Sequence, residues 1–83
     1  MSHWSRTDLA LARTFHFPAF PDAIAFVTRL GFYAQGVDHH PDILIQYSKV
    51  TVTWSTHDAG RVTPKDDAGA AETDHLARMS GAT

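Results

Sequence analysis

Three histidines of this chain could exchange protons with a bound molecule. His39 and His40 are adjacent and are followed by Pro41, and His57 comes later in the chain. An imidazole titrates near neutral pH, so it can serve as an acid or as a base in catalysis. Pro41 restricts His40 to extended backbone angles and so limits the direction of that ring. We predict that His39, His40 and His57 form a catalytic site, provided that the loops carrying them meet.

Spacing alone leaves two other interpretations of these histidines open. Histidines also occur by chance in surface loops, and three imidazoles can bind zinc. Adjacent residues rarely ligate the same ion, because their side chains diverge, and the chain has no HxH or HxxxH spacing. We therefore expect no metal at this site. The remaining histidines occupy places that suit a structural role, namely a chain end, a strand and a helix: His3, His16 and His75.

Three carboxylates lie close to these histidines in the sequence. Asp38 precedes His39, Asp58 follows His57, and Asp66 lies a little further on. A carboxylate can hold a histidine in one tautomer or raise its pKa. Asp66 also has a competing role, because a helix is expected to begin beside it.

The elements that must position these residues follow from the hydrophobic pattern. Alternation of apolar and polar residues predicts strands at 9–17, 43–47 and 50–55, with a hairpin or sharp bend at Ser48-Lys49. Apolar residues at steps of three and four predict a helix over 21–36. The histidine pair therefore lies in the loop that leaves this helix.

A last helix is expected to begin at Thr63. Thr63 suits the N-cap, Pro64 suits the first helical position, and Asp66 at the third position makes a weak capping box. The residues expected on the inward face of this helix are Ala68, Ala71, His75, Leu76 and Met79.

The order strand, helix, strand, strand, helix predicts an α+β fold. We expect a small antiparallel sheet with the helices packed on one face, which is a two-layer sandwich. The length suffices for a single domain, 1–83, whose ends at 1–8 and 80–83 are expected to be loose. Loop ends of such a sheet can meet at one edge, which would bring the histidine loops together.

Composition excludes several classes of function. The chain has no cysteine, so disulfides, thiolate catalysis and sulfur-bound zinc are ruled out. Its net charge of −2 argues against nucleic acid as a direct partner, which would need a basic footprint. It has no apolar run of roughly 20 residues that could span a membrane and no secretory signal, so we expect a cytoplasmic protein. The core of so small a domain is thin, which together with exposed sheet edges favours self-association.

The segments around the histidines are similar to the signature of a known family. Asp38-His39-His40-Pro41-Asp42-Ile43, then Tyr47-Ser48-Lys49-Val50, then Ser55-Thr56-His57-Asp58 resemble the pterin-4a-carbinolamine dehydratases. The TxxD of Thr63-Pro64-Lys65-Asp66 resembles the start of the family's final helix. The resemblance covers most of the chain, and the combination of HHP and THD at this spacing is specific.

This resemblance implies a reaction, a set of residues and no cofactor. The family dehydrates 4a-hydroxytetrahydropterin, the product that aromatic amino-acid hydroxylases leave behind, to quinonoid dihydropterin, and it needs no metal or organic cofactor. By position, the catalytic residues would be His39, His40 and His57. The residues that would contact the pterin are Asp38, Pro41, Ser55, Thr56 and Asp58, with Gln35 and Asp66 in supporting roles.

The resemblance also implies partners. Members form dimers or tetramers, and some relatives are non-enzymatic binding proteins: a dimerisation cofactor for a transcription factor, or a RuBisCO assembly factor. A protein client, such as a hydroxylase, RuBisCO or a transcription factor, is therefore the alternative to catalysis. Two residues depart from the family pattern: Gln35 stands where a glutamate is usual, and Arg61 stands where many members have a second glycine.

Overall fold

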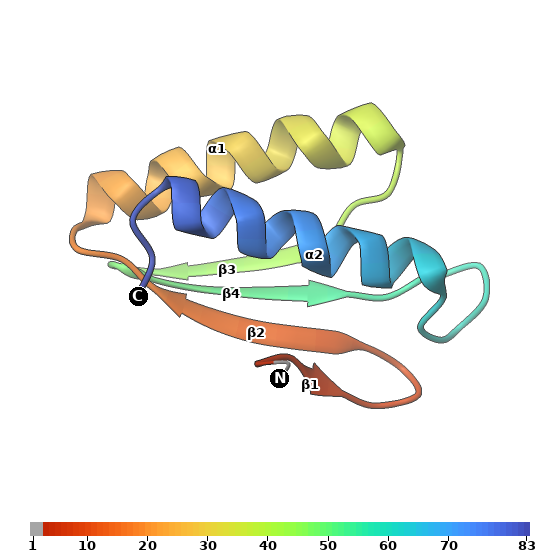
Figure 1. Cartoon of the computed structure of the whole chain (residues 1–83). Helices are drawn as coiled ribbons and strands as arrows, with labels where there is room; N and C mark the ends of the chain where they lie inside the picture. Colours follow the sequence, from red (N-terminus) through yellow and green to blue (C-terminus); the bar gives the residue numbers. More distant parts are fainter. Residues whose placement is uncertain (1–2) are drawn as a thin grey trace.

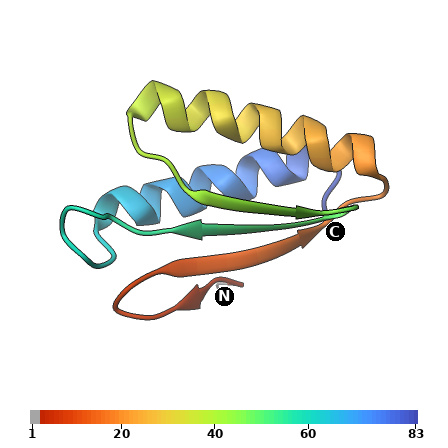
Figure 2. The same ribbon diagram turned by 180° about the vertical axis from the view of Figure 1, so that it is seen from behind.

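The computed structural model describes residues 3–83 and has the predicted α+β architecture. Along the chain the elements are β1 (Ser5–Arg6), β2 (Leu11–His16), α1 (Phe20–Val37), β3 (Asp42–Gln46), β4 (Lys49–Trp54) and α2 (Pro64–Met79). Opposite views show both helices lying on the same face of one four-stranded sheet (Figure 1, Figure 2). The predicted two-layer sandwich is confirmed, and its strands and helices agree closely with the predicted segments.

The sheet has the strand order β1-β2-β4-β3, so β4 lies in its interior. β4 pairs antiparallel with β2 on one side and with β3 on the other. Alternate residues of β4 face the helices, and Val50, Val52 and Trp54 are fully buried there. The turn between β3 and β4 consists of Tyr47-Ser48, one residue before the predicted break.

Helix α1 packs on the sheet through the stripe that its sequence predicts. Phe26 lies at the centre of this contact, with its ring centroid 5.4 Å from that of Phe15 and 5.0 Å from that of Phe17. These aromatic contacts hold α1 against β2 and the segment that follows it. The buried residues of α1 recur at steps of three and four: Ala23, Phe26, Leu30 and Ala34.

The inward face of α2 differs from the prediction. Of the residues expected there only Leu76 is buried, and Met79 is 58% exposed. The stripe that is buried also has steps of three and four, but it begins on a carboxylate and runs through small and hydroxyl-bearing residues. The spacing of apolar residues alone therefore does not identify the buried side of α2. The buried residues of α2 are Asp66, Gly69, Ala70, Thr73, Leu76 and Ala77.

The close approach of α2 to the sheet depends on Gly69. A Cβ atom at this position would lie 2.7 Å from Cε2 of Trp54, well inside van der Waals contact. The Trp54 indole N–H donates to the Thr73 hydroxyl at 2.9 Å, and that hydroxyl donates to the Gly69 carbonyl at 2.6 Å. Trp54 therefore fills the space that a larger residue at position 69 would need.

The chain ends, which we expected to be loose at 1–8 and 80–83, make specific contacts instead. The Trp4 ring packs edge-on against Phe15 with centroids 6.0 Å apart, and β1 pairs with β2. At the other end, the Thr83 N–H donates to the carbonyl of the last residue of β2 at 3.0 Å. Both ends therefore belong to the fold, except that the first two residues lie outside the described part of the chain.

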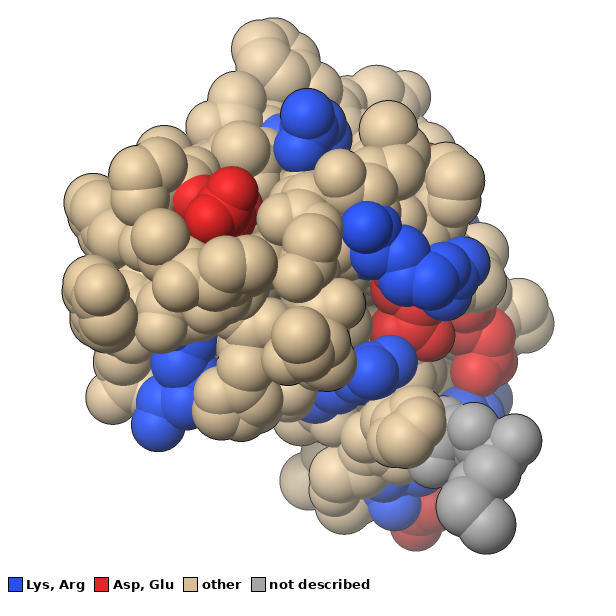
Figure 3. Space-filling model, turned by 60° about the vertical axis from the view of Figure 1, so that its left-hand side comes forward, with Lys and Arg blue, Asp and Glu red and all other residues tan. Residues whose placement is uncertain are grey.

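The surface shown in Figure 3 carries basic and acidic side chains in mixed order. Lysine and arginine residues are separated there by uncharged surface, and some of them border acidic residues (Figure 3). This face therefore lacks a broad basic area of the kind that binds nucleic acid. Within residues 3–83, no helix is long and apolar enough to cross a membrane.

We expect Gly69→Ala to lower the free energy of unfolding by about 1–3 kcal/mol, because the added methyl group would overpack the Trp54 ring. Gly31→Ala is the matched control, since Gly31 also lies inside a helix but a Cβ there would meet no atom within 4 Å. Alanine is favoured over glycine in helices by about 1 kcal/mol, so the control should gain stability. Urea unfolding of both variants measures the difference, and equal changes would contradict the crowding of Gly69 by Trp54.

Candidate active site

The three histidines line one pocket. The loops that carry them lie at the end of the sheet where α1 and β4 both end (Figure 1). The pocket has a volume of about 440 Å³, which is within the usual range for small-molecule sites. Its walls come from the loop after α1, the start of β3, the loop after β4 and the first turn of α2. The lining residues are Asp38, His39, His40, Pro41, Asp42, Thr56, His57, Asp58 and Lys65.

A left-handed residue at the end of α1 places the first histidine. Asp38 follows the last helical residue and has φ 54° and ψ 43°. Aspartate tolerates this conformation better than most residues other than glycine. The N–H of His39 donates back to the Ala34 carbonyl at 3.1 Å. This bend ends the helix and directs the His39 side chain towards the start of α2.

His39 meets a buried carboxylate at the start of α2. Its Nε2 lies 2.6 Å from Oδ1 of Asp66, whose side chain has no exposed surface. The other oxygen, Oδ2, accepts from the Thr56 hydroxyl at 2.7 Å and from the Thr63 N–H at 2.9 Å. Because the Thr56 proton is used in that bond, the Thr63 hydroxyl donates to Thr56 Oγ1 at 2.6 Å. Asp66 therefore caps the helix and holds a histidine at the same time.

Hydrogen bonds decide the charge of Asp66. Burial by itself raises the pKa of this carboxyl group, since it disfavours the charged form. Hydrogen bonds from His39, from the Thr63 N–H and from Thr56 outweigh burial, and the pKa of Asp66 is lowered from its ordinary value. Asp66 is therefore ionised at neutral pH. An ionised carboxylate only accepts, so the proton between the two groups lies on Nε2 of His39.

The face of the His39 ring is held as well. It stacks on the Trp54 indole, with ring centroids 5.3 Å apart and planes 24° apart. Nδ1 has no hydrogen bond among the described residues. Every fully buried side-chain nitrogen or oxygen atom there has a partner, so Nδ1 is not fully buried. When His39 is neutral, Nδ1 therefore carries a lone pair that is accessible from the pocket.

His40 is exposed and is supported from α1. Its Nε2 lies 2.9 Å from Oε1 of Gln35, so the glutamine amide accepts the ring proton. Gln35 thus supplies a neutral hydrogen-bond acceptor to this ring. The second ring nitrogen of His40 makes no hydrogen bond within residues 3–83.

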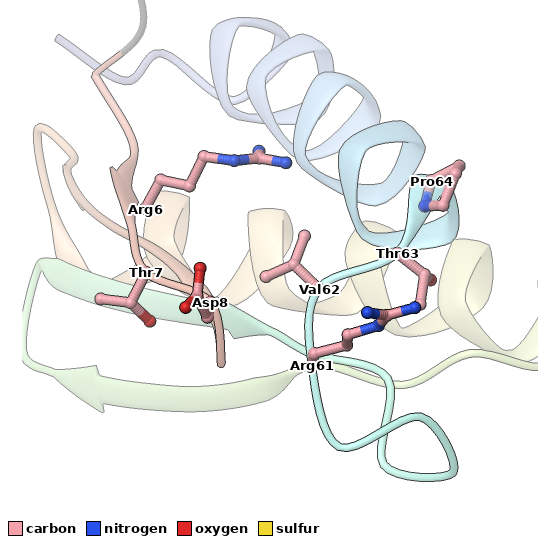
Figure 4. Close-up of a pocket in the computed structure, with 7 residues that line it drawn as sticks. All are labelled: Arg6, Thr7, Asp8, Arg61, Val62, Thr63 and Pro64. Atoms are coloured by element: carbon pink, nitrogen blue, oxygen red, sulfur yellow. The ribbon is translucent and has the colours of Figure 1, made fainter.

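His57 lies in a tight loop between β4 and α2. The Thr56 N–H donates to the Arg61 carbonyl at 3.2 Å, and Gly60 adopts a left-handed φ of 65° inside the loop. The His57 side chain is exposed and lines the pocket. The Arg61 side chain lines a separate hollow together with Arg6 of β1 (Figure 4). Arg61 therefore does not fill the histidine pocket.

Most of the predicted site residues line this pocket, and a few do not. Ser55, Gln35 and Asp66 lie outside its lining, and Asp66 is buried behind His39. Asp42 and Lys65 line it and were not expected to do so. Asp42 follows Pro41 and Lys65 precedes Asp66 in the sequence. This adjacency to predicted site residues was the one feature of the sequence that could have indicated them. The predicted residues that do line the pocket are His39, His40, His57, Asp38, Pro41, Thr56 and Asp58.

This arrangement suits proton transfer. His39 has one tautomer and an accessible nitrogen, and His40 and His57 present exposed imidazoles to the same pocket. In the described part of the chain, no three or more His, Cys, Asp or Glu side chains are arranged to hold a metal ion. Imidazoles placed in this way are able to act as general acids and bases.

The fold and the site define a small α+β domain with a histidine-lined pocket, and comparison with known proteins gives its family. The sequence profile of the family described as pterin 4 alpha carbinolamine dehydratase matches residues 1–76. A protein of Roseiflexus castenholzii, provisionally named pterin-4-alpha-carbinolamine dehydratase, is 46% identical over 92% of this chain and 82% of its own length. One of Chloroflexus aurantiacus with the same provisional name is 48% identical over 88% of this chain and 78% of its own. The chain therefore belongs to the pterin 4 alpha carbinolamine dehydratase family.

Two solved structures share the fold. A transcriptional coactivator/pterin dehydratase from Brucella melitensis has a TM-score of 0.87 and 32% identity, with 93% of this chain and 84% of that chain covered. A pterin dehydratase-like protein identified as a RuBisCO assembly factor in the alpha-carboxysome has a TM-score of 0.74 and 23% identity, over 89% of this chain and 86% of its own. The second likeness shows the fold alone. The predicted family and fold are both confirmed.

The stability of the protein should fall in acid because of Asp66. Since the pKa of Asp66 is lowered in the folded protein, its contribution is present above the unfolded pKa of about 4 and is lost as the pH falls through the lower folded value. Asp66→Asn should flatten this acid dependence and cost about 1–3 kcal/mol at neutral pH, because the amide replaces one acceptor oxygen with an NH2 group that cannot accept from the donors on that side. Urea unfolding between about pH 2 and pH 7 measures both effects.

Asp67→Asn is the matched control for this experiment. Asp67 lies in the same first turn of α2, but it is exposed and pairs with Arg6 at the surface. Exposed ion pairs contribute little to stability, so this variant should follow the wild-type curve closely. If Asp66→Asn and Asp67→Asn gave the same acid dependence, the lowered pKa of Asp66 would not account for acid unfolding.

Proposed function

We propose that the protein is a 4a-hydroxytetrahydropterin dehydratase. It converts 4a-hydroxytetrahydropterin to quinonoid dihydropterin and water, and thereby supports pterin recycling. The observation that carries the proposal is the His39–Asp66 pair at a pocket that His40 and His57 also line. Membership of the family suggests the substrate class, and the proposal includes no metal or organic cofactor.

Loss of water from this substrate needs an acid and a base. The acid donates a proton to the departing 4a-hydroxyl group, the bond between C4a and this oxygen breaks, and water leaves. The base takes one proton from the pterin ring, so that the ring ends as the neutral quinonoid dihydropterin. An imidazole can take either part, because it titrates near neutral pH.

We assign His39 and His57 to proton exchange on the 4a-hydroxyl group. The hydrogen bond to Asp66 occupies Nε2 of His39, so this histidine exchanges protons through Nδ1. When Nδ1 is protonated, the ionised Asp66 balances the charge of the imidazolium at 2.6 Å. His40 then positions the pterin ring or acts as the partner base. The lining residues proposed to contact the pterin are Asp38, Pro41, Thr56 and Asp58.

A second candidate function is that of a non-enzymatic binding or assembly protein. The fold neighbour identified as a RuBisCO assembly factor motivates it, and so does exposed apolar surface, such as Phe32 of α1 at 78% exposure. The client would be a hydroxylase, RuBisCO or a transcription factor. Gene neighbourhood separates the candidates: a gene beside phenylalanine hydroxylase favours the enzyme, and one beside RuBisCO or carboxysome shell genes favours the assembly factor.

Self-association should occur through the outer edge of β3. Among residues 3–83 no strand pairs with the outer side of β3, and Leu44 within this strand and Tyr47 just after it are 54% and 72% exposed. Such an edge pairs readily with another chain. Light scattering at micromolar concentration should give the mass of a dimer or tetramer, and Leu44→Lys should shift the mass towards the monomer. A monomeric wild type would contradict this prediction.

The purified protein should speed the decay of 4a-hydroxytetrahydropterin formed by an aromatic amino-acid hydroxylase. His40→Ala and His57→Ala should each slow the catalysed reaction by about a hundredfold or more, which is the usual worth of a general acid or base. The disappearance of the hydroxypterin absorbance measures the rate. EDTA should leave the rate unchanged.

His75→Ala is the matched control for these substitutions. His75 is exposed on α2 and does not line the histidine pocket, so its removal should leave the rate at the wild-type value. A folded wild type that is no faster than buffer would overturn the proposed dehydratase. Loss of activity in EDTA that zinc restores would revive a metal site.

A further inference from the structure

We infer that Trp54 is a positioning residue that holds the His39 ring in the orientation in which Nδ1 opens to the pocket. The inference rests on the proposed function, because it concerns the histidine that exchanges the proton. Alternation along β4 marks Trp54 as a core residue, and the structure buries it fully. Its contacts give it a second role at the site.

Two contacts fix the His39 ring in different directions. Asp66 holds one edge of the ring at Nε2, at 2.6 Å. A single hydrogen bond at one ring nitrogen leaves the plane of the ring free to tilt about that bond. The Trp54 indole covers one face of the ring, with centroids 5.3 Å apart and planes 24° apart, and removes this freedom. With both contacts in place, the direction of the Nδ1 lone pair is set.

Trp54 is itself fixed from both helices. Its indole N–H donates to the Thr73 hydroxyl of α2 at 2.9 Å, and the missing side chain of Gly69 lets the ring lie against that helix. From α1, the Tyr33 ring meets it edge-on, with centroids 6.3 Å apart and planes at 76°. The indole therefore cannot move without displacing a neighbouring helix, and it transmits this rigidity to His39.

The orientation of His39 matters because proton transfer needs close alignment of the reacting atoms. A misplacement of about 1 Å, even by a change outside the chemistry itself, can slow a reaction by about a hundredfold. Loss of the flat indole face should therefore lower the rate of the chemical step. Binding of the pterin should change little, because Trp54 does not line the pocket.

Kinetics of two Trp54 variants test the inference. Trp54→Leu keeps apolar bulk but removes the flat face, and it should lower kcat about tenfold to a hundredfold with KM nearly unchanged. Trp54→Phe keeps a flat face against the His39 ring and should retain most of the wild-type kcat. Trp4→Phe is the matched control, since Trp4 packs on Phe15 away from the pocket, and it should keep the wild-type kcat.

The nitrogen-15 signal of the His39 ring gives a readout that does not depend on turnover. Nitrogen-15 chemical shifts of a neutral imidazole distinguish a proton on Nε2 from one on Nδ1. Wild type should show the Nε2–H tautomer of His39 with a sharp Nδ1 signal. Trp54→Leu should keep this tautomer, which Asp66 sets, but should broaden or shift the Nδ1 signal because the ring then samples several tilts. Thr73→Val keeps the indole but removes the acceptor of its N–H, so it should show a smaller effect of the same kind. This variant replaces Trp54→Leu if the latter does not fold.

The two readouts separate the failure of the inference from the failure of the proposed function. A folded Trp54→Leu protein, or Thr73→Val in its place, with wild-type kcat and an Nδ1 signal of His39 as sharp and at the same shift as in the wild type would overturn the inference. An inactive but folded wild type would overturn the proposed dehydratase. In that case the width and shift of the Nδ1 signal would still decide whether Trp54 orients His39.

Discussion

The buried carboxylate of Asp66 connects parts of the molecule that are far apart in the sequence. One of its oxygens binds His39, from the loop after α1, and the other binds Thr56 and the N–H of Thr63. An ionised group without exposed surface is strongly destabilising unless its acceptor positions are satisfied. The loop after α1, the loop after β4 and the start of α2 therefore converge on one charge. The pocket lies at this place because the charge needs donors from all three.

The same carboxylate determines which side of α2 faces the sheet. With Asp66 turned inward, Gly69 and Thr73 follow on the buried side at steps of three and four. Neither contributes apolar bulk, but one makes room for Trp54 and the other accepts its N–H. The hold of α2 on the sheet therefore depends on close fit and on hydrogen bonds more than on the burial of large apolar side chains.

Much of the fold could be predicted because it depends on local periodicity. The apolar residue types of α1 and β4 alone predict the buried stripe and the alternation, and the burial in the structure agrees with both. The face of α2 could not be read in this way, because its buried stripe starts at Asp66. The three histidines could be nominated by type, but the contact of His39 with Asp66 is long-range and no spacing shows it. Trp54 has the pattern of any core residue, so its place beneath His39 was hidden too.

Asp38 combines two roles in one residue, because it forms the bend that ends α1 and also lines the pocket. Its left-handed backbone disfavours most residues by about 1–2 kcal/mol, while glycine, asparagine and aspartate tolerate it best. The presence of aspartate in the lining of the pocket is therefore explained by the bend of the chain as well as by any contact with a ligand. Asparagine or glycine there would preserve the bend and remove the charge. Natural variation at this one position can therefore retune the electrostatic field of the pocket while leaving the path of the chain unchanged.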